Sequence, residues 1–293
     1  MIQNRPIIGH IRFSYYGQTD TRMQPDEDGI TLARLYDETR MAQRFFFFEN
    51  LTLPSLRAQT DGDFRILLMS SDLMPDRFKT RLAALVAGDP RFTIDFSPHR
   101  HGRRAFIGHM RASAGADGQT ETVHFRLDDD DALGVGYIAR LRAASAPLAV
   151  STHISFPTGL VLFPASANSP DGTLMGERGF LTSQGIATVC GPGYLKNPFQ
   201  MRHGDVWLRW PIYSDPTLPA FIRTHHLTND TRDRQDDILA PVRRERFSRR
   251  AAAHLARADE LLADGFPFLN RAGLESLLGR AAQIRSLADL PDP

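Results

Sequence analysis

Four consecutive aspartates, Asp128 to Asp131, are the residues of this sequence whose types and spacing are best suited to chemistry. The run follows an apolar segment, residues 122–127, and the apolar pair Ala132 and Leu133 comes directly after it. Adjacent carboxylates repel one another, which raises their proton affinity unless a cation lies nearby. Carboxylate oxygens are also the ligands that Mg2+ and related divalent ions prefer. The pattern therefore predicts a divalent-metal site, and the alternative is a solvated acidic turn.

Two known metal motifs with spaced aspartates do not match this run. An EF-hand loop has an oxygen-bearing side chain where this chain has Ala132, and a glycine where it has Leu133. A phosphatase of the haloacid dehalogenase type also carries Asp-x-Asp at the end of a strand. Its motif has Thr or Val at position 132, however, and usually lies close to the N-terminus.

The segments around the acidic run alternate between strand-like and helix-like patterns. Strands are expected at residues 6–16, 64–72, 91–96 and 120–127, and helices at about residues 31–53, closed by Pro54, at 75–88 and at 104–114. This order of strands and helices predicts an α/β fold with a mostly parallel sheet. Ligands of open α/β sheets gather beyond the carboxyl ends of the strands, which is where the acidic run lies.

The second half of the chain has shorter and less regular patterns. A helix is expected at residues 134–145, and strands at residues 147–151, 158–163 and 185–189, whereas residues 193–228 are expected to be irregular. Beyond Pro241 the composition shifts to Arg, Ala and Leu with helical spacing. We therefore expect an α/β domain at residues 1–240 and a helical C-terminal extension at residues 241–293 that packs on it.

Charge and cysteine content exclude several classes of protein. The chain has 35 Lys and Arg against 34 Asp and Glu, so no net field attracts a polyanion and no nucleic-acid partner is expected. A single cysteine, Cys190, fits a reducing compartment, and we expect a cytoplasmic protein. No stretch approaches the roughly 20 apolar residues of a membrane helix. The arginines of residues 243–257 offer either a solvated helix face or a peripheral contact with an anionic membrane.

Residues 126–133, Arg-Leu-Asp-Asp-Asp-Asp-Ala-Leu, resemble the Arg-Leu-Asp-x-Asp-Asp-Ala-Leu signature of the GT-A-fold family catalogued as putative rhamnosyl transferases. Residues 53–60 with Phe64, and residues 226–229, resemble further parts of that family. The resemblance implies a GT-A-like, Rossmann-like mixed sheet, a nucleotide diphosphate sugar as donor, and a Mn2+ or Mg2+ ion. The acceptor would be a glycan, a lipid or a small molecule. In such enzymes the cation neutralises the charge that grows on the leaving diphosphate.

The resemblance also implies roles for individual residues of the acidic run. Asp128 and Asp130 would form the Asp-x-Asp pair at the metal, and Asp131 would be a further ligand or would orient one. Asp129 is expected to point away and to be dispensable. A late histidine often completes the metal and diphosphate site in GT-A enzymes, and His226 matches that position, with an ordinary core or surface histidine as the alternative.

Other candidates would contact the rest of the donor. Arg12, Ser14 and Asp72 occupy strand ends where GT-A folds meet the nucleoside, although strand ends are commonly polar. Arg103 and Arg104, within a basic cluster, are candidates for the diphosphate because a guanidinium pairs with phosphate oxygens in a fork; a solvated basic turn is the alternative.

The catalytic step itself has one candidate residue. An inverting transferase needs a carboxylate base near the acceptor hydroxyl, and Asp205 is that candidate, whereas a retaining enzyme needs none. A different class of function also fits the resemblance, namely a GT-A-like binding or partner protein that carries out no reaction, because function resides in the site and not in the fold.

Overall fold

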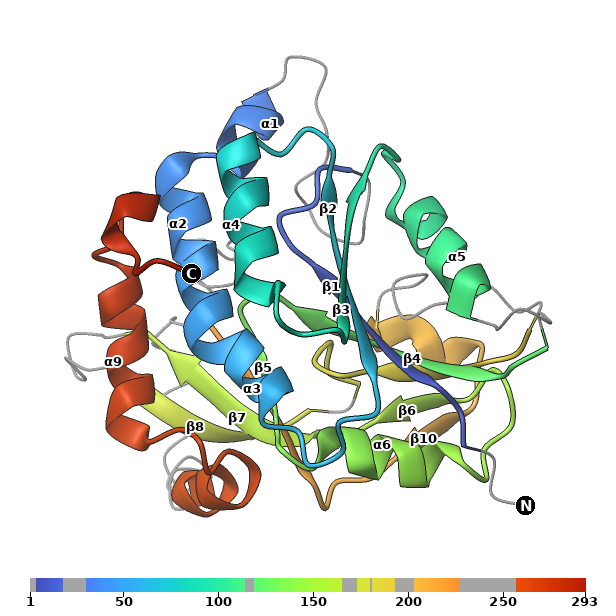
Figure 1. Cartoon of the computed structure of the whole chain (residues 1–293). Helices are drawn as coiled ribbons and strands as arrows, with labels where there is room; N and C mark the ends of the chain where they lie inside the picture. The colour runs from blue at the N-terminus through green and yellow to red at the C-terminus, as the bar shows by residue number, and fades with distance from the viewer. Residues whose placement is uncertain are drawn as a thin grey trace.

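The computed structural model of the chain describes residues 4–17, 30–113, 119–164, 173–179, 181–192, 203–226 and 257–293. Within these ranges the chain forms two sheets with helices packed around them (Figure 1). The predicted α/β class, with a mixed sheet flanked by helices, is confirmed.

The larger sheet has seven strands in the order β10-β6-β9-β4-β1-β2-β3. They are β1 (Ile7–Arg12), β2 (Arg65–Ser71), β3 (Phe92–Ser97), β4 (Thr122–Asp128), β6 (His153–Ser155), β9 (Ala187–Cys190) and β10 (Ile212–Ser214). Strand β1 is parallel to both β2 and β4, whereas β9 runs antiparallel to β4 and β6. Arg12 pairs with Asp128 in the register of β1 and β4, so the carboxyl ends of these two strands lie side by side.

The smaller sheet has four strands in the order β5-β11-β7-β8. They are β5 (Ala132–Leu133), β7 (Thr158–Phe163), β8 (Thr173–Arg178) and β11 (Pro219–Thr224). Strand β5 follows the acidic run directly and pairs antiparallel with β11, Leu133 lying opposite Phe221. This pairing brings the end of β11 to the acidic run.

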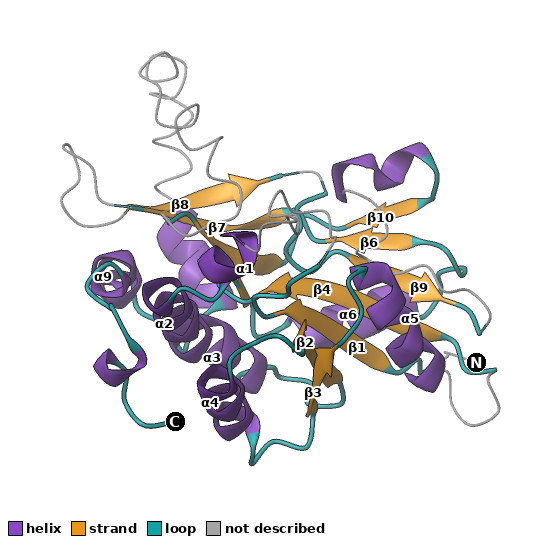
Figure 2. Ribbon diagram, turned by 90° about the horizontal axis from the view of Figure 1, so that it is seen from above, coloured by secondary structure: helices purple, strands orange, loops and turns teal. Residues whose placement is uncertain are grey.

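Helices cover both faces of the larger sheet. The helical elements are α1 (Ile30–Leu35), α2 (Glu38–Phe47), the π-helical turn η1 (Phe48–Thr52), α3 (Leu53–Arg57), α4 (Asp76–Val86), α5 (Gly102–Ser113), α6 (Tyr137–Ser145), the 3-10 turn η2 (His203–Leu208), α9 (Arg271–Ala281) and the 3-10 turn η5 (Leu287–Asp289). Helices α2, α3 and α4 lie next to one another, with α9 beyond α2 (Figure 2). Helix α5 lies on the opposite side of β1 and β3 from α2 and α4 (Figure 1).

The long helix expected at residues 31–53 is divided into several elements. Helix α1 ends at Leu35, and Asp37 then caps α2 by accepting a hydrogen bond from the backbone nitrogen of Arg40 at 3.0 Å. The prediction that Pro54 closes the helix was wrong, because helical structure continues to Arg57. Pro54, which has no backbone N–H to donate, comes just after the π-helical turn η1 within this continuous helical segment.

Other predicted boundaries fail where the backbone leaves the extended region. The first strand ends at Arg12 and not at residue 16, since Ser14 has a φ of 45°. The strand expected at residues 147–151 is a turn region in which Ser151 has a φ of 75°, and β6 begins only at His153. The expectation of an irregular segment at residues 193–228 was wrong for β10 and β11.

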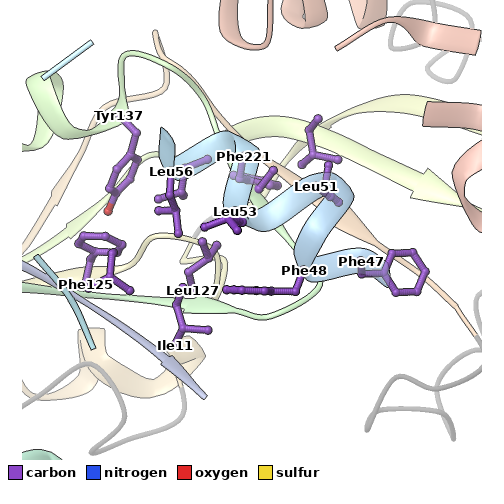
Figure 3. Packing of buried hydrophobic residues seen from close by; sticks show 14 of the residues in the cluster. Ile11, Phe47, Phe48, Leu51, Leu53, Leu56, Phe125, Leu127, Tyr137 and Phe221 are labelled. Carbon is purple, nitrogen blue, oxygen red and sulfur yellow. The ribbon is translucent and has the colours of Figure 1, made fainter. Parts of the chain in front are cut away.

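One hydrophobic core joins the larger sheet to the helices on its α2 side. Ile11 and Leu127 point from the sheet toward Phe48, Leu53 and neighbouring side chains of η1 and α3 (Figure 3). Phe48 is completely buried, and its ring centroid lies 5.4 Å from that of Phe13. Burying an aromatic side chain of this kind stabilises a fold by about 1.5–3 kcal/mol through its apolar area alone.

The C-terminal segment packs against α2 within the described residues. Thr39 Oγ1 donates to the carbonyl oxygen of Arg285 at 2.9 Å, and Gln43 Nε2 donates to that of Ile284 at 3.2 Å. The predicted helical character is confirmed at residues 257–265 and in α9, whereas residues 241–256 and the proposed boundary at 240 lie outside the described residues. Among the described helices, none combines the length and the hydropathy needed to cross a membrane.

A buried histidine pair connects β1 and β4 on the face covered by α5. Nε2 of His10 lies 2.7 Å from Nδ1 of His124, and Nε2 of His124 lies 2.8 Å from Oγ1 of Thr122. The ring of Phe106 in α5 packs edge-on against His10, with 5.0 Å between centroids. Burial lowers the pKa of His124 to about 3 and, with the neighbouring His124, lowers the pKa of His10 well below its ordinary value.

This pair predicts a loss of stability in mild acid. Below the unfolded-state histidine pKa of roughly 6.5, the unfolded chain binds more protons than the folded chain, so stability falls as the pH falls toward about 3. Between pH 7 and pH 5 the wild type should lose about 1–2 kcal/mol more free energy of unfolding than His124→Gln, since one pH unit is worth about 1.4 kcal/mol per proton. Urea unfolding at the two pH values measures this difference.

The matched control is His101→Gln, which removes an imidazole from the surface and should leave the difference between the two pH values unchanged. An equal loss in wild type and His124→Gln would show that the buried pair does not set the acid limit.

Candidate active site

The acidic run lies at the carboxyl edge of the larger sheet, between β4 and β5, and most of it is buried. The relative exposure of Asp129, Asp130 and Asp131 is 1%, 5% and 3%, whereas the side chain of Asp128 is 30% exposed. A solvated acidic turn would expose all four carboxylates to water. That alternative is therefore wrong for three of them, and each buried carboxylate needs partners from other elements.

Asp130 is held by one cation from α2 and one imidazole from the end of β11. Arg44 Nη1 donates to Asp130 Oδ2, and Nε2 of His226 lies 2.9 Å from the same oxygen. The ring of Phe47 stacks on His226 with 4.2 Å between centroids and 19° between planes. Burial acts to raise the pKa of Asp130, but the Arg44 guanidinium and His226 outweigh it, and the pKa lies well below the ordinary value.

Asp129 shares the same cation, which differs from the expectation that it points away. Its Oδ1 lies 3.3 Å from Arg44 Nη1. Burial raises the pKa of Asp129 to about 7, partly offset by Arg44 and reinforced by the charge of Asp130. The same Arg44 nitrogen therefore contacts the carboxylates of both Asp129 and Asp130.

Asp131 fastens the acidic run to the smaller sheet. Its Oδ2 accepts from Gln184 Nε2 at 2.6 Å, and its Oδ1 accepts from the backbone nitrogen of Thr224 at 3.0 Å. The Thr224 hydroxyl in turn donates to the carbonyl oxygen of Asp130 at 2.8 Å. Both carboxylate oxygens have protein partners, so the geometry favours the orienting role over that of a further ligand.

Asp128 forms the rim of the cluster. Its Oδ1 lies 3.4 Å from Arg12 Nη2 and 3.6 Å from Arg126 Nη2. Ser14, the next candidate along the chain, is buried, and its hydroxyl accepts from Nη1 of Arg40 in α2 at 3.0 Å. Of the strand-end candidates, Arg12 thus contacts the acidic run and Ser14 contacts α2.

The family model described as putative rhamnosyl transferase matches residues 6–237. The chain belongs to this family. The membership places it among glycosyltransferases, and the transferase has the mixed α/β sheet that the resemblance implied. The comparison with curated proteins gave no match.

Several solved structures of S. aureus TarS are similar to the transferase at low identity. The TarS 1-349 complex with UDP-GlcNAc is 10% identical at a TM-score of 0.41, covering 88% of this chain and 70% of that one. The complex with UDP is 12% identical at a TM-score of 0.38, covering 95% and 75%. Another TarS structure, also 12% identical at 0.38, is longer, and the transferase spans only 42% of it.

The remaining predicted residues of the transferase lie outside the cluster. Asp72, just after β2, accepts from Arg100 Nη2 at 2.8 Å and is partly exposed. Arg104 lies exposed in the first turn of α5. Asp205 lies in η2, which leads into β10, and the sheet order puts β6 and β9 between β10 and β4. The structure thus brings together Asp128, Asp130, Asp131 and His226, with Arg12 and Ser14 beside them.

Sequence reasoning missed the contribution of α2. Arg40, Arg44 and Phe47 are spaced by four and three residues and therefore share one helix face, which lies over the cluster. A signal was present, because the two arginines lie one turn apart on the helix face that also carries Phe47, and buried cations need carboxylate partners. Gln184 and Thr224 carried no comparable signal.

A divalent cation fits these residues in kind but not in arrangement. Asp130 and His226 supply a carboxylate oxygen and an imidazole nitrogen 2.9 Å apart, and both types of ligand suit Mn2+. Across the described residues, however, no three His, Cys, Asp or Glu side chains are grouped so as to hold a metal ion. The oxygen of Asp130 that faces His226 is also the one paired with Arg44.

Proposed function

We propose that the transferase moves a sugar from a nucleotide diphosphate donor to a glycan, lipid or small-molecule acceptor in a reaction that depends on Mn2+ or Mg2+. The observation that carries the proposal is the cluster of buried carboxylates at the carboxyl edge of parallel strands, with His226 against Asp130. Family membership supports the class of reaction.

The proposal gives the residues of the cluster separate tasks. Asp130 and His226 would hold the cation, Asp128 would complete the site from the rim, and Asp131 would fix the turn through Thr224. When bound, the cation supplies positive charge beside the leaving diphosphate. The protein's own part is to keep Asp130 ionised, through the Arg44 pair that lowers its pKa.

The proposal extends to residues outside the cluster. Arg12, Ser14, Asp72 and Arg104 would contact the donor, and Asp205 would be the base of an inverting reaction. Residues 1–240 would form the catalytic domain, on which residues 241–293 pack as a helical extension. Cytoplasmic localisation rests on the single cysteine.

The first test is a thermal-shift screen of nucleoside diphosphates with and without Mn2+. A ligand at 100 times its dissociation constant stabilises a protein by about 2.7 kcal/mol, which corresponds to several degrees in Tm for a chain of this size. We expect such a shift only when the metal and one nucleotide are both present. Omitting Mn2+ or adding EDTA is the control.

Two outcomes would contradict the proposal in different ways. If a nucleotide gave its full Tm shift in EDTA, the proposed nucleotide donor would stand and the proposed dependence on a metal ion would be refuted. The absence of a shift with any pair would favour the alternative of a binding or partner protein without activity.

A further inference from the structure

The guanidinium of Arg44 occupies the place beside Asp130 that a metal ion bound to this carboxylate would need. Arg44 and Asp130 form an ion pair in which each side chain is 7% exposed, and Asp129 lies 3.3 Å from the same Arg44 nitrogen. Arg44 belongs to α2, which is far from the acidic run in sequence. It lies on the same face of α2 as Phe47, whose ring stacks on His226. The ion pair is therefore built by packing and not by a local turn.

Arg44 and a divalent ion cannot share this site without a cost. Both would pair with the carboxylate of Asp130, whose Oδ2 already accepts from Arg44, and like charges held a few ångströms apart in a buried site repel strongly. An arginine cannot lower this repulsion by losing its proton, because its pKa stays above the physiological range. Either the guanidinium moves away from Asp130 or the cation binds weakly.

A nucleotide diphosphate offers the guanidinium another partner. Phosphate oxygens pair with guanidinium groups through two parallel hydrogen bonds, which are stronger than bonds between neutral groups. The diphosphate also brings negative charge, which offsets the repulsion between the Arg44 guanidinium and the divalent ion. Entry of the diphosphate would therefore free the Asp130 carboxylate from Arg44 when the donor brings its need for a cation.

We propose that Arg44 is a built-in counter-ion of the acidic run, which closes Asp130 to divalent cations until a nucleotide diphosphate enters. The inference rests on the proposed function, since it concerns regulation of the same site. It makes metal binding conditional on the donor, so that the enzyme without donor holds no tightly bound cation.

The test is a titration of the full chain with Mn2+ in the absence of nucleotide. The electron paramagnetic resonance signal of unbound Mn2+ measures how much of the ion is bound. Arg44→Gln should bind Mn2+ at least about tenfold more tightly than the wild type, because the competing charge is gone. Arg44→Lys keeps the charge and should stay as weak as the wild type. Arg44→Met, which keeps an apolar stem, is the second variant if Arg44→Gln does not fold.

A matched control is available in α4. Arg81 is also buried and pairs with a carboxylate, Glu49, at 2.8 Å, but it belongs to the surroundings of η1 and not to the acidic run. Arg81→Gln removes a buried ion pair of the same type and should leave the Mn2+ affinity unchanged. A similar gain in Mn2+ affinity in Arg81→Gln would show that loss of any buried ion pair loosens the fold enough to bind the ion, and it would overturn the inference.

The wild type decides the question independently of any variant. Its Mn2+ affinity should rise at least about tenfold when the nucleoside diphosphate from the thermal-shift screen is added. Tight Mn2+ binding without nucleotide, or equal affinities in wild type and Arg44→Gln, would overturn the role of Arg44 and leave the proposed function intact. Failure of every form to bind Mn2+, with or without nucleotide, would instead refute the metal in the proposed function.

Discussion

Asp130→Asn should reduce turnover of the nucleotide-sugar donor by at least about a hundredfold while the fold remains in place. The amide keeps the volume of the carboxylate but removes the charge that pairs with Arg44 and faces His226. The fold should survive because Asp129, already 3.3 Å from Arg44, can ionise and take over the pairing. Initial rates of donor hydrolysis over a panel of nucleotide sugars with Mn2+ measure the loss, since many transferases slowly hydrolyse their own donor.

The control for this variant is Asp76→Asn in α4, whose side chain is 96% exposed. It should retain wild-type rates. Circular dichroism and the Tm of Asp130→Asn must show a folded chain before its rate is interpreted. Wild-type turnover in a folded Asp130→Asn variant would refute the assignment of the active site.

Phe48→Ala should lower the free energy of unfolding by about 3–5 kcal/mol. Phe48 is completely buried at the start of the π-helical turn η1, where it packs on Phe13 and on the aliphatic residues of the sheet (Figure 3). The truncation leaves a cavity that rigid neighbours from strands and helix cannot fill. Urea unfolding at neutral pH measures the change.

Leu73→Ala is the matched control, because it also truncates an apolar side chain but one that is 44% exposed. Its effect should stay within about 0.5 kcal/mol, as for other surface positions. A loss below about 1 kcal/mol in Phe48→Ala would mean that the core between α2 and the sheet can collapse around the missing ring.

Elements with a strong local pattern were predicted close to their real limits. The apolar run at residues 64–72 is β2 (Arg65–Ser71), the helix at residues 75–88 is α4 (Asp76–Val86), and the strand at residues 158–163 is β7 (Thr158–Phe163). Their identity follows from side-chain periodicity within a few residues, which the sequence displays directly. Prediction failed where a single residue with positive φ stood inside an expected strand, as at Ser14 and Ser151.

The site divides in the same manner. A run of carboxylates after a buried strand is local information, and it was enough to locate the active-site candidate and to predict a need for positive charge. The source of that charge was not local. Arg44 lies 86 residues away in α2, and its arrival depends on how α2 packs against the sheet.

The acidic run is thus the part of this protein that the sequence by itself determined, in its position at a strand end and in its demand for a cation. Only the tertiary structure decided how the demand is met. The pairing of β5 with β11 brings Thr224 and His226 to the run, and the packing of α2 brings Arg44. The reason is physical: charge repulsion acts between neighbours in the chain, whereas the groups that relieve it in a buried site are chosen by packing between distant segments.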